Sequence, residues 1–167
     1  MSGSSGNISE DSIEAAKSLP TLNDDITGKV VQNTSLLDST VVLKLNGGLG
    51  TSMGLDKAKS LLDVKGGNTF LDLTAKQVIT MRNEFKSPIK FMLMNSFNTS
   101  KDTLTFLSKY PSITGTDAAS SIELMQNKVP KVNKSDNTPV EWSLNKHLEW
   151  CPPGHGDLYT ALLGSGK

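Results

Sequence analysis

Short apolar runs alternate with longer amphipathic stretches along most of this chain, and this order limits the possible folds more than any other feature. The runs 41–45 and 89–94 are typical of buried strands, and 122–126 alternates weakly, as a third strand would. The stretch 70–85 has helical spacing, and Asn98-Thr99-Ser100 offers N-caps for a second helix over 98–110 that Pro111 closes. Because this order connects parallel strands through helices, the sequence predicts an α/β fold with a mostly parallel sheet and helices on both faces.

Composition separates a polar tail from a compact part. Residues 1–39 are polar and turn-rich, and one short helix is expected over Ser9–Leu19. Residues 40–167 hold all the strand patterns and the remaining helix patterns. Within them, 127–146 is rich in Lys, Asn, Ser and Asp, which predicts an exposed excursion, and Asp157 is placed to cap a last short helix.

The charge balance argues against a protein that binds through bulk positive charge. Lys plus Arg and Asp plus Glu both number 17, whereas nucleic-acid binding by counterion release needs a basic excess. No apolar run approaches the ~20 residues of a membrane span. Cys151 and two histidines are too few for an ordinary zinc site of Cys and His alone. The segment 1–7 lacks a signal-peptide pattern, so we expect a cytoplasmic protein that binds neither nucleic acid nor membrane.

The sharpest local feature is a glycine-rich loop directly after the first predicted strand, with the sequence Leu45-Asn46-Gly47-Gly48-Leu49-Gly50-Thr51-Ser52-Met53-Gly54. Backbone N–H groups in such a loop can approach a phosphate or the edge of a base closely. Two standard motifs do not fit, because the dinucleotide fingerprint would need glycine at Met53 and a Walker A loop would need lysine at Leu55. An isolated glycine cluster is more often a tight turn between a strand and a helix.

Other positions could contact a ligand at the carboxyl ends of the strands, which is where open parallel sheets bind ligands. Lys57 and Lys59 are the cations nearest the loop and could neutralise a leaving phosphate, although most lysines are only solvated. Gln126 ends a predicted strand and could read the edge of a base. His155 lies between two glycines after a proline pair, and the ordinary alternative there is a surface turn.

Together these loops resemble the UTP–glucose-1-phosphate uridylyltransferases, also called UDP-glucose pyrophosphorylases. The matching segments are spread over 41–167 in the family's order, and the combination is far more specific than any one of them. They are Lys44–Gly54, Lys59-Ser60, Thr69–Asp72, Gln126 before Pro130, and Pro152–Asp157.

The resemblance implies a Rossmann-like nucleotidyltransferase domain of the GT-A type, which is a three-layer sandwich. It also implies that UTP and glucose 1-phosphate react to give UDP-glucose and pyrophosphate, with Mg²⁺ as cofactor. The sugar phosphate would attack the α-phosphorus in line, so catalysis would depend on alignment and charge neutralisation. The positions implied to bind substrate are Leu45, Asn46, Gly47, Gly48, Lys59, Gln126, Gly154 and His155.

The matched positions have separate implied roles. The backbone of the Leu45–Gly48 segment would hold the uridine part and the phosphates. Lys59 would be the catalytic residue that stabilises the leaving pyrophosphate. Gln126 and Gly154 would read uracil through hydrogen bonds, and His155 would lie against the sugar phosphate.

The chain departs from the family pattern at Ala58, where many members have proline, and at Ser52, where the wider superfamily often has arginine. The family's metal-binding aspartate segment, its sugar-binding half and its C-terminal β-helix domain would follow Lys167. We therefore expect an N-terminal fragment with no metal ligands, weak UTP binding and no turnover alone, whose homo-oligomer contacts would lie in the missing domain. The alternatives are a broad-specificity UDP-sugar pyrophosphorylase and a non-catalytic nucleotide-binding fragment. The sequence of Asn46–Leu49 disfavours the UDP-N-acetylhexosamine enzymes.

Overall fold

The computed structural model describes residues 6–29, 33–117 and 121–167. The chain divides into two compact units, Met1–Asn33 and Thr34–Lys167. None of the helices formed by the described residues is long and apolar enough to cross a membrane.

The first unit contains only short helical segments among its described residues, and all of these residues are exposed. The helix expected over Ser9–Leu19 is wrong, because only a 3-10 turn forms there. Ile13 is 63% exposed, so its side chain gains nothing from packing, and short helices without packing are marginal in water. The segments are η1 (Glu10–Ser12), η2 (Leu22–Ile26) and η3 (Thr27–Lys29).

The second unit is built on a three-stranded parallel sheet in the order β1-β4-β5. Its register aligns Asn46 with Asn95, and Asn95 with Met125, at the carboxyl ends of the strands. The three predicted strands and their parallel direction are therefore confirmed. The strands are β1 (Val41–Asn46), β4 (Lys90–Asn95) and β5 (Glu123–Met125).

The first predicted helix forms in full, whereas the second is shorter than expected. α1 spans Phe70–Phe85. The stretch 98–110 contains only α2 (Ser100–Leu107), and Pro111 begins a new helix, α3 (Pro111–Thr114). Proline suits the first turn of a helix because its missing N–H would have no partner there.

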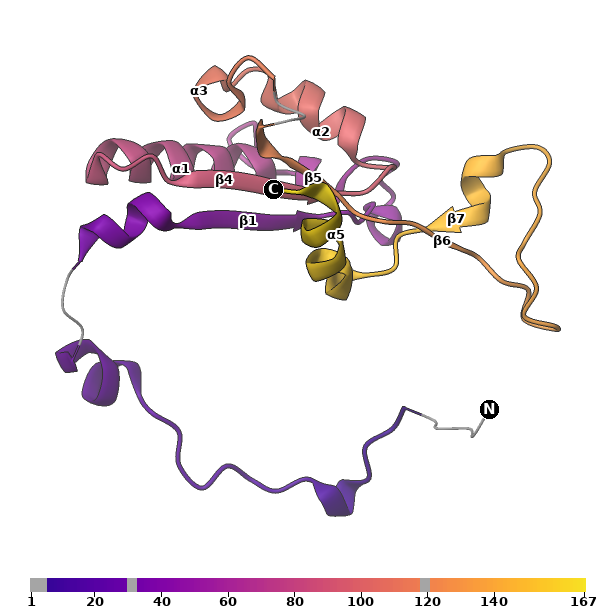
Figure 1. Ribbon diagram of the computed structural model, residues 1–167, viewed down its shortest axis with the longest axis horizontal. Helices are drawn as coiled ribbons and strands as arrows, with labels where there is room; N and C mark the ends of the chain where they lie inside the picture. Colours follow the sequence, from indigo (N-terminus) through magenta and orange to yellow (C-terminus); the bar gives the residue numbers. More distant parts are fainter. Residues whose placement is uncertain (1–5, 30–32, 118–120) are drawn as a thin grey trace. The chain divides into compact units, whose positions relative to one another are not determined.

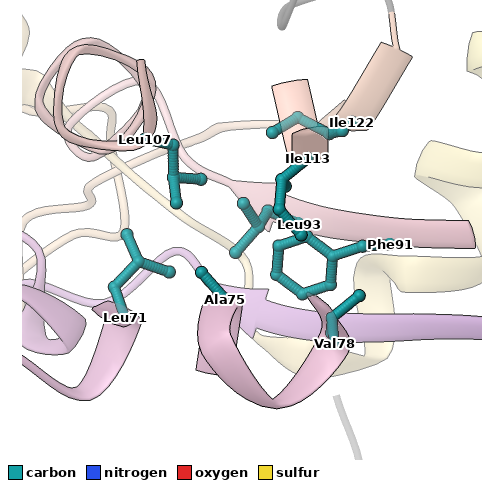
Figure 2. Packing of buried hydrophobic residues seen from close by; sticks show 8 residues of the cluster. All are labelled: Leu71, Ala75, Val78, Phe91, Leu93, Leu107, Ile113 and Ile122. Atoms are coloured by element: carbon teal, nitrogen blue, oxygen red, sulfur yellow. The ribbon is translucent and has the colours of Figure 1, made fainter. Parts of the chain in front are cut away.

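Side chains alternate between the two faces of the sheet, and different helices cover each face. On one face Phe91 and Leu93 pack with α1, α2 and α3 (Figure 2). On the other face Met92 and Met94 pack with α5 (Leu158–Ser165). Figure 1 shows α2 and α3 on one side of the sheet and α5 on the other. The predicted sandwich of helices, sheet and helix is confirmed.

The remaining elements of the second unit are short and mostly exposed. The excursion over 127–146 is exposed apart from half-buried Val140, as predicted. Asp157 is the N-cap residue of α5, but its carboxylate accepts hydrogen bonds from Asn127 instead of capping the helix. The elements are η4 (Thr34–Ser39), η5 (Thr51–Met53), η6 (Lys59–Leu61), the antiparallel pair β2 (Asp63–Lys65) and β3 (Asn68–Thr69), the antiparallel pair β6 (Val129–Pro130) and β7 (Trp150–Cys151), η7 (Lys146–Glu149) and η8 (His155–Asp157).

Candidate functional site

The glycine-rich loop folds back on itself where β1 ends. Leu49 and Ala58 form an antiparallel bridge. The backbone N–H of Lys59 donates to the carbonyl oxygen of Gly48 at 3.1 Å. The segment is therefore a small hairpin with η5 at its tip, and its backbone pairing holds Lys59 beside the end of β1.

Buried polar side chains join the carboxyl ends of β1 and β4 to α2 and to the first residue of β5. Asn46 Nδ2 donates to Asn95 Oδ1 at 2.7 Å and to Thr103 Oγ1 at 2.9 Å. Asn95 Nδ2 donates to Glu123 Oε1 at 2.7 Å. All four residues are at most 8% exposed, and we call them the strand-end cluster. Because Asn46 Nδ2 already has two protein partners, this residue offers a ligand its backbone rather than its amide nitrogen.

Gln126 connects the glycine-rich loop to the loop that carries His155. Its Nε2 donates to the carbonyl oxygen of Gly154 at 2.6 Å. Its Oε1 lies against Gly47, where an added Cβ would come within 2.3 Å of that oxygen. Gly154 has φ 110° and ψ 178°, a conformation that is essentially limited to glycine. The two glycines therefore allow Gln126 to fit between the loops.

A pocket of about 440 Å³ opens at this edge of the sheet. Five of the positions predicted from sequence lie on its wall, namely Leu45, Asn46, Gly48, Lys59 and His155. The other three are not on its wall: Gln126 contacts Gly47 and Gly154, and it lines a separate pocket next to α5. The structure thus brings all eight predicted positions to one region, from segments that are far apart in the sequence.

Four further residues on the pocket wall lie in the matching segments but were given no binding role from the sequence, namely Lys44, Leu49, Ser60 and Phe70. Lys44 is a lysine inside an otherwise apolar strand, which was a usable signal. Phe70 begins α1 and is 46% exposed, so its ring is open to the pocket side of the helix end. Ser60 stood out in the sequence only as the neighbour of Lys59 in a matching segment.

The charge on the pocket wall is of one sign. Lys44, Lys59 and His155 contribute basic groups, and the nine residues on the wall include no Asp or Glu. Positive groups beside backbone N–H donors favour an anionic ligand. The composition of the wall therefore suits phosphate better than a cation.

A second buried polar group supports the start of α1, and we call Thr69, Asp72, Lys109 and Tyr110 the Asp72 cluster. The Asp72 carboxylate accepts hydrogen bonds from Thr69 N at 2.8 Å and Tyr110 Oη at 2.5 Å, and it pairs with Lys109 Nζ at 2.7 Å. Burial alone would raise the pKa of Asp72, but these hydrogen bonds outweigh it and hold the pKa well below its usual range. Burial and the neighbouring Asp72 charge raise the pKa of Tyr110 to about 12.

The family assignment follows from comparison with known proteins. The model of the family UTP–glucose-1-phosphate uridylyltransferase matches residues 2–167. The chain belongs to this family. The uridylyltransferase of Saccharomyces cerevisiae is 42% identical over 147 residues, which are 86% of this chain and 28% of the yeast protein. The uridylyltransferase of Solanum tuberosum is 42% identical over 140 residues, which are 81% of this chain and 28% of the potato protein.

Solved structures of the same family share the fold. The UDP-glucose pyrophosphorylase of Leishmania major, known in open and closed structures, is 48% identical with a TM-score of 0.85, over 98% of this chain and 33% of that chain. A Leishmania major variant in complex with UDP-glucose is 49% identical with a TM-score of 0.86, over 97% and 33%. A Trypanosoma brucei UDP-glucose phosphorylase is 50% identical with a TM-score of 0.81, over 98% and 33%. The chain thus spans about a third of these structures and 28% of the curated relatives above.

A resident Mg²⁺ would need several oxygen donors close together in this fold. Within the described ranges, no group of three or more Asp, Glu, His or Cys residues lies close enough together to bind a metal ion. Carboxylates and other oxygen donors are the ligands that Mg²⁺ prefers. The described residues therefore do not fit a resident Mg²⁺.

Proposed function

We propose that this chain carries the nucleotide-binding part of a uridylyltransferase that forms UDP-glucose and pyrophosphate from UTP and glucose 1-phosphate. The observation that carries the proposal is the acid-free pocket at the carboxyl edge of the parallel sheet, where Gly48, Lys59 and His155 meet. Membership of the family and the UDP-glucose complexes of the Leishmania major relative support it.

Each group of residues at the pocket has a separate proposed role. Backbone groups of Leu45–Gly48 hold the uridine and phosphate parts of UTP. Lys59 stabilises the charge that develops on pyrophosphate as the sugar phosphate attacks the α-phosphorus from the opposite side. His155 shares the pocket wall with Lys59 and contacts the sugar phosphate. Since both reactants are polyanions, alignment and charge neutralisation supply most of the rate.

Gln126 is proposed to select uracil together with Gly154. Its Nε2 is held on Gly154, which leaves Oε1 as the acceptor beside Gly47. The N3–H of uracil can donate to such an acceptor, whereas cytosine has no hydrogen at that position. Leaving a buried acceptor without a donor is unfavourable, so a base that lacks the N3–H should bind more weakly than uracil.

Titration of the chain with UTP, CTP and ATP by calorimetry tests the proposal. We expect weak binding with UTP preferred over CTP by about tenfold or more. Equal affinities for the three nucleotides would contradict the assignment of Gln126 and Gly154.

Lys59 can be tested against a matched neighbour. In an enzyme of the relatives' length that contains this chain, Lys59→Ala should lower kcat by about 100-fold, with little change in the melting temperature. Lys57→Ala removes the same charge from the same loop, but Lys57 lines a different pocket, so kcat should change little. Equal effects of the two substitutions would show that Lys59 acts only through the overall charge.

The finer expectations stay predictions. They are the Mg²⁺ requirement, the cytoplasmic location, homo-oligomerisation, and the absence of nucleic-acid and membrane binding.

A further inference from the structure

Ser60 differs from the other buried polar side chains of the second unit. It follows Lys59 in η6, is 7% exposed and lies on the wall of the pocket. Its Oγ is the one buried side-chain oxygen or nitrogen in the described part of the chain that has no hydrogen-bond partner. Leaving a buried hydroxyl unpaired is unfavourable, so a serine at this position gains from a partner that arrives with a ligand.

The wall around Ser60 indicates the chemistry of that partner. Lys44, Lys59 and His155 share the wall with it, and no carboxylate there could accept its hydrogen bond. Because the described residues give Ser60 Oγ no partner, a ligand can supply the acceptor, and the basic surroundings favour an anionic oxygen. The backbone of this turn is fixed, because Lys59 N–H is bonded to Gly48. Rotation about the single χ1 bond of Ser60 is the smallest motion that would bring Oγ to the pocket.

We infer that the Ser60 hydroxyl donates a hydrogen bond to a phosphate oxygen of the bound nucleotide, beside the Lys59 ammonium group. The inference rests on the proposed function and adds a phosphate-binding residue to it. Lysine supplies charge without a fixed direction, whereas a short hydroxyl on a fixed turn can donate only to a phosphate oxygen in one place. Ser60 thus orients the phosphate that Lys59 neutralises.

Two serine-to-alanine substitutions separate this role from a structural one. Ser87 is equally buried, at 4% exposure, but its Oγ donates to Asp38 Oδ1 at 2.7 Å. Ser87→Ala should lower the melting temperature of the free chain by about 2–5 °C, because it breaks a hydrogen bond to a charged group. Ser60→Ala should leave the melting temperature unchanged or raise it, because it removes an unpaired buried hydroxyl.

Ligand binding should show the opposite order. With Ser60→Ala, the Kd values for UTP and for inorganic pyrophosphate should rise by about tenfold or more, and the Kd for uridine should not change. With Ser87→Ala, all three Kd values should match those of the unsubstituted chain. Calorimetry serves for UTP and pyrophosphate, and ligand-observed NMR serves for uridine.

The outcomes distinguish this inference from the proposed function. Pyrophosphate binding that depends on Ser60, without preference for UTP over CTP and ATP, would overturn the proposed function and support the phosphate contact. Preferred UTP binding with unchanged pyrophosphate and UTP affinities in Ser60→Ala would overturn the inference alone. A fall in melting temperature equal to that of Ser87→Ala would show that Ser60 has a structural partner and would also overturn it. Failure of the unsubstituted chain to bind either UTP or pyrophosphate would overturn both.

Discussion

The strand-end cluster and the Asp72 cluster are both polar groups of the second unit, but they differ in their hydrogen bonding and in their position. The strand-end cluster is joined mainly by the amides of Asn46 and Asn95, and Asn46 also lies on the pocket wall. The Asp72 cluster is centred on one carboxylate, and its members do not line the pocket. One group therefore supports the fold and the site together, whereas the other supports the fold at the start of α1.

This difference predicts how stability and nucleotide affinity should respond to pH and to substitutions in each cluster. The bonds that Asn46 donates to Asn95 and Thr103 involve no carboxylate, whereas the Asp72 carboxylate accepts several donors and loses stabilisation when it is protonated. A substitution in the strand-end cluster should alter both stability and nucleotide affinity. A substitution in the Asp72 cluster should alter stability alone.

Asp72→Ala should give the largest loss of stability. It removes the capping box of α1 and leaves Tyr110 Oη and Lys109 Nζ without their buried acceptor. We expect the free energy of unfolding to fall by about 3–5 kcal/mol in urea titrations. The UTP affinity of the folded fraction should stay within about threefold of the starting value. A stability loss below about 1 kcal/mol would mean that the cluster is not held as described.

Asn95→Leu should give a smaller loss of stability together with a loss of affinity. Leucine preserves the volume, but it leaves Glu123 and one of the two bonds of Asn46 Nδ2 without a partner. Urea titration should show a loss of about 2–4 kcal/mol, and calorimetry should show a higher Kd for UTP. An unchanged Kd for UTP would show that the strand-end cluster does not support the nucleotide site. The two clusters would then affect stability alone.

Acid should reduce the contribution of Asp72. Because its pKa is lowered in the folded state, its stabilisation is present above its unfolded pKa, near 4, and is lost as the pH falls toward its folded value. The difference in unfolding free energy between the unsubstituted chain and Asp72→Asn should therefore narrow below pH 4, by at most about 1.4 kcal/mol per pH unit. Urea titrations at pH 6, 4 and 3 test this, and a constant difference would contradict the assigned cause.

Gly47→Ala should change stability least and selectivity most clearly. Its Cβ would meet Gln126 Oε1, the movable end of a side chain, so we expect a cost of about 1 kcal/mol. Displacing that amide should reduce the preference for UTP over CTP. Gly48→Ala is the comparison within the same loop, because an added Cβ there meets no atom of the chain within 4 Å; since Gly48 lines the pocket, it should change the affinities for UTP and CTP alike and keep the preference. Equal loss of selectivity in the two variants would argue against base reading by Gln126.

Local patterns predicted the sheet and α1 because they depend on neighbouring residues. The run at 41–45 and the spacing over Phe70–Phe85 needed no distant partner to be interpreted. The Ser9–Leu19 helix failed because its apolar residues have nothing to pack on, and a pattern cannot show whether a partner exists. The end of α2 at Leu107 was missed because proline can begin a helix as well as follow one.

Site residues that belong to a sequence motif were predictable. Residues that are recognised only by a contact between distant parts of the fold were not. Lys59 and His155 belong to recognisable loops, and both lie on the pocket wall. Ser60 belongs to a matching segment, but only three-dimensional packing shows that its hydroxyl is buried without a partner. The pairing of Asp72 with Tyr110 likewise joins residues 38 positions apart, and no local pattern contains it.

The backbone bond between Lys59 and Gly48 also bears on how this loop can change during evolution. The residues at its tip, Thr51–Gly54, are all exposed, and the hairpin closes at its base rather than at its tip. Lengthening a surface loop costs little once its ends are joined. Insertions, deletions or a grafted fluorescent label at the tip should therefore be tolerated, since they leave the lysine at its base in place.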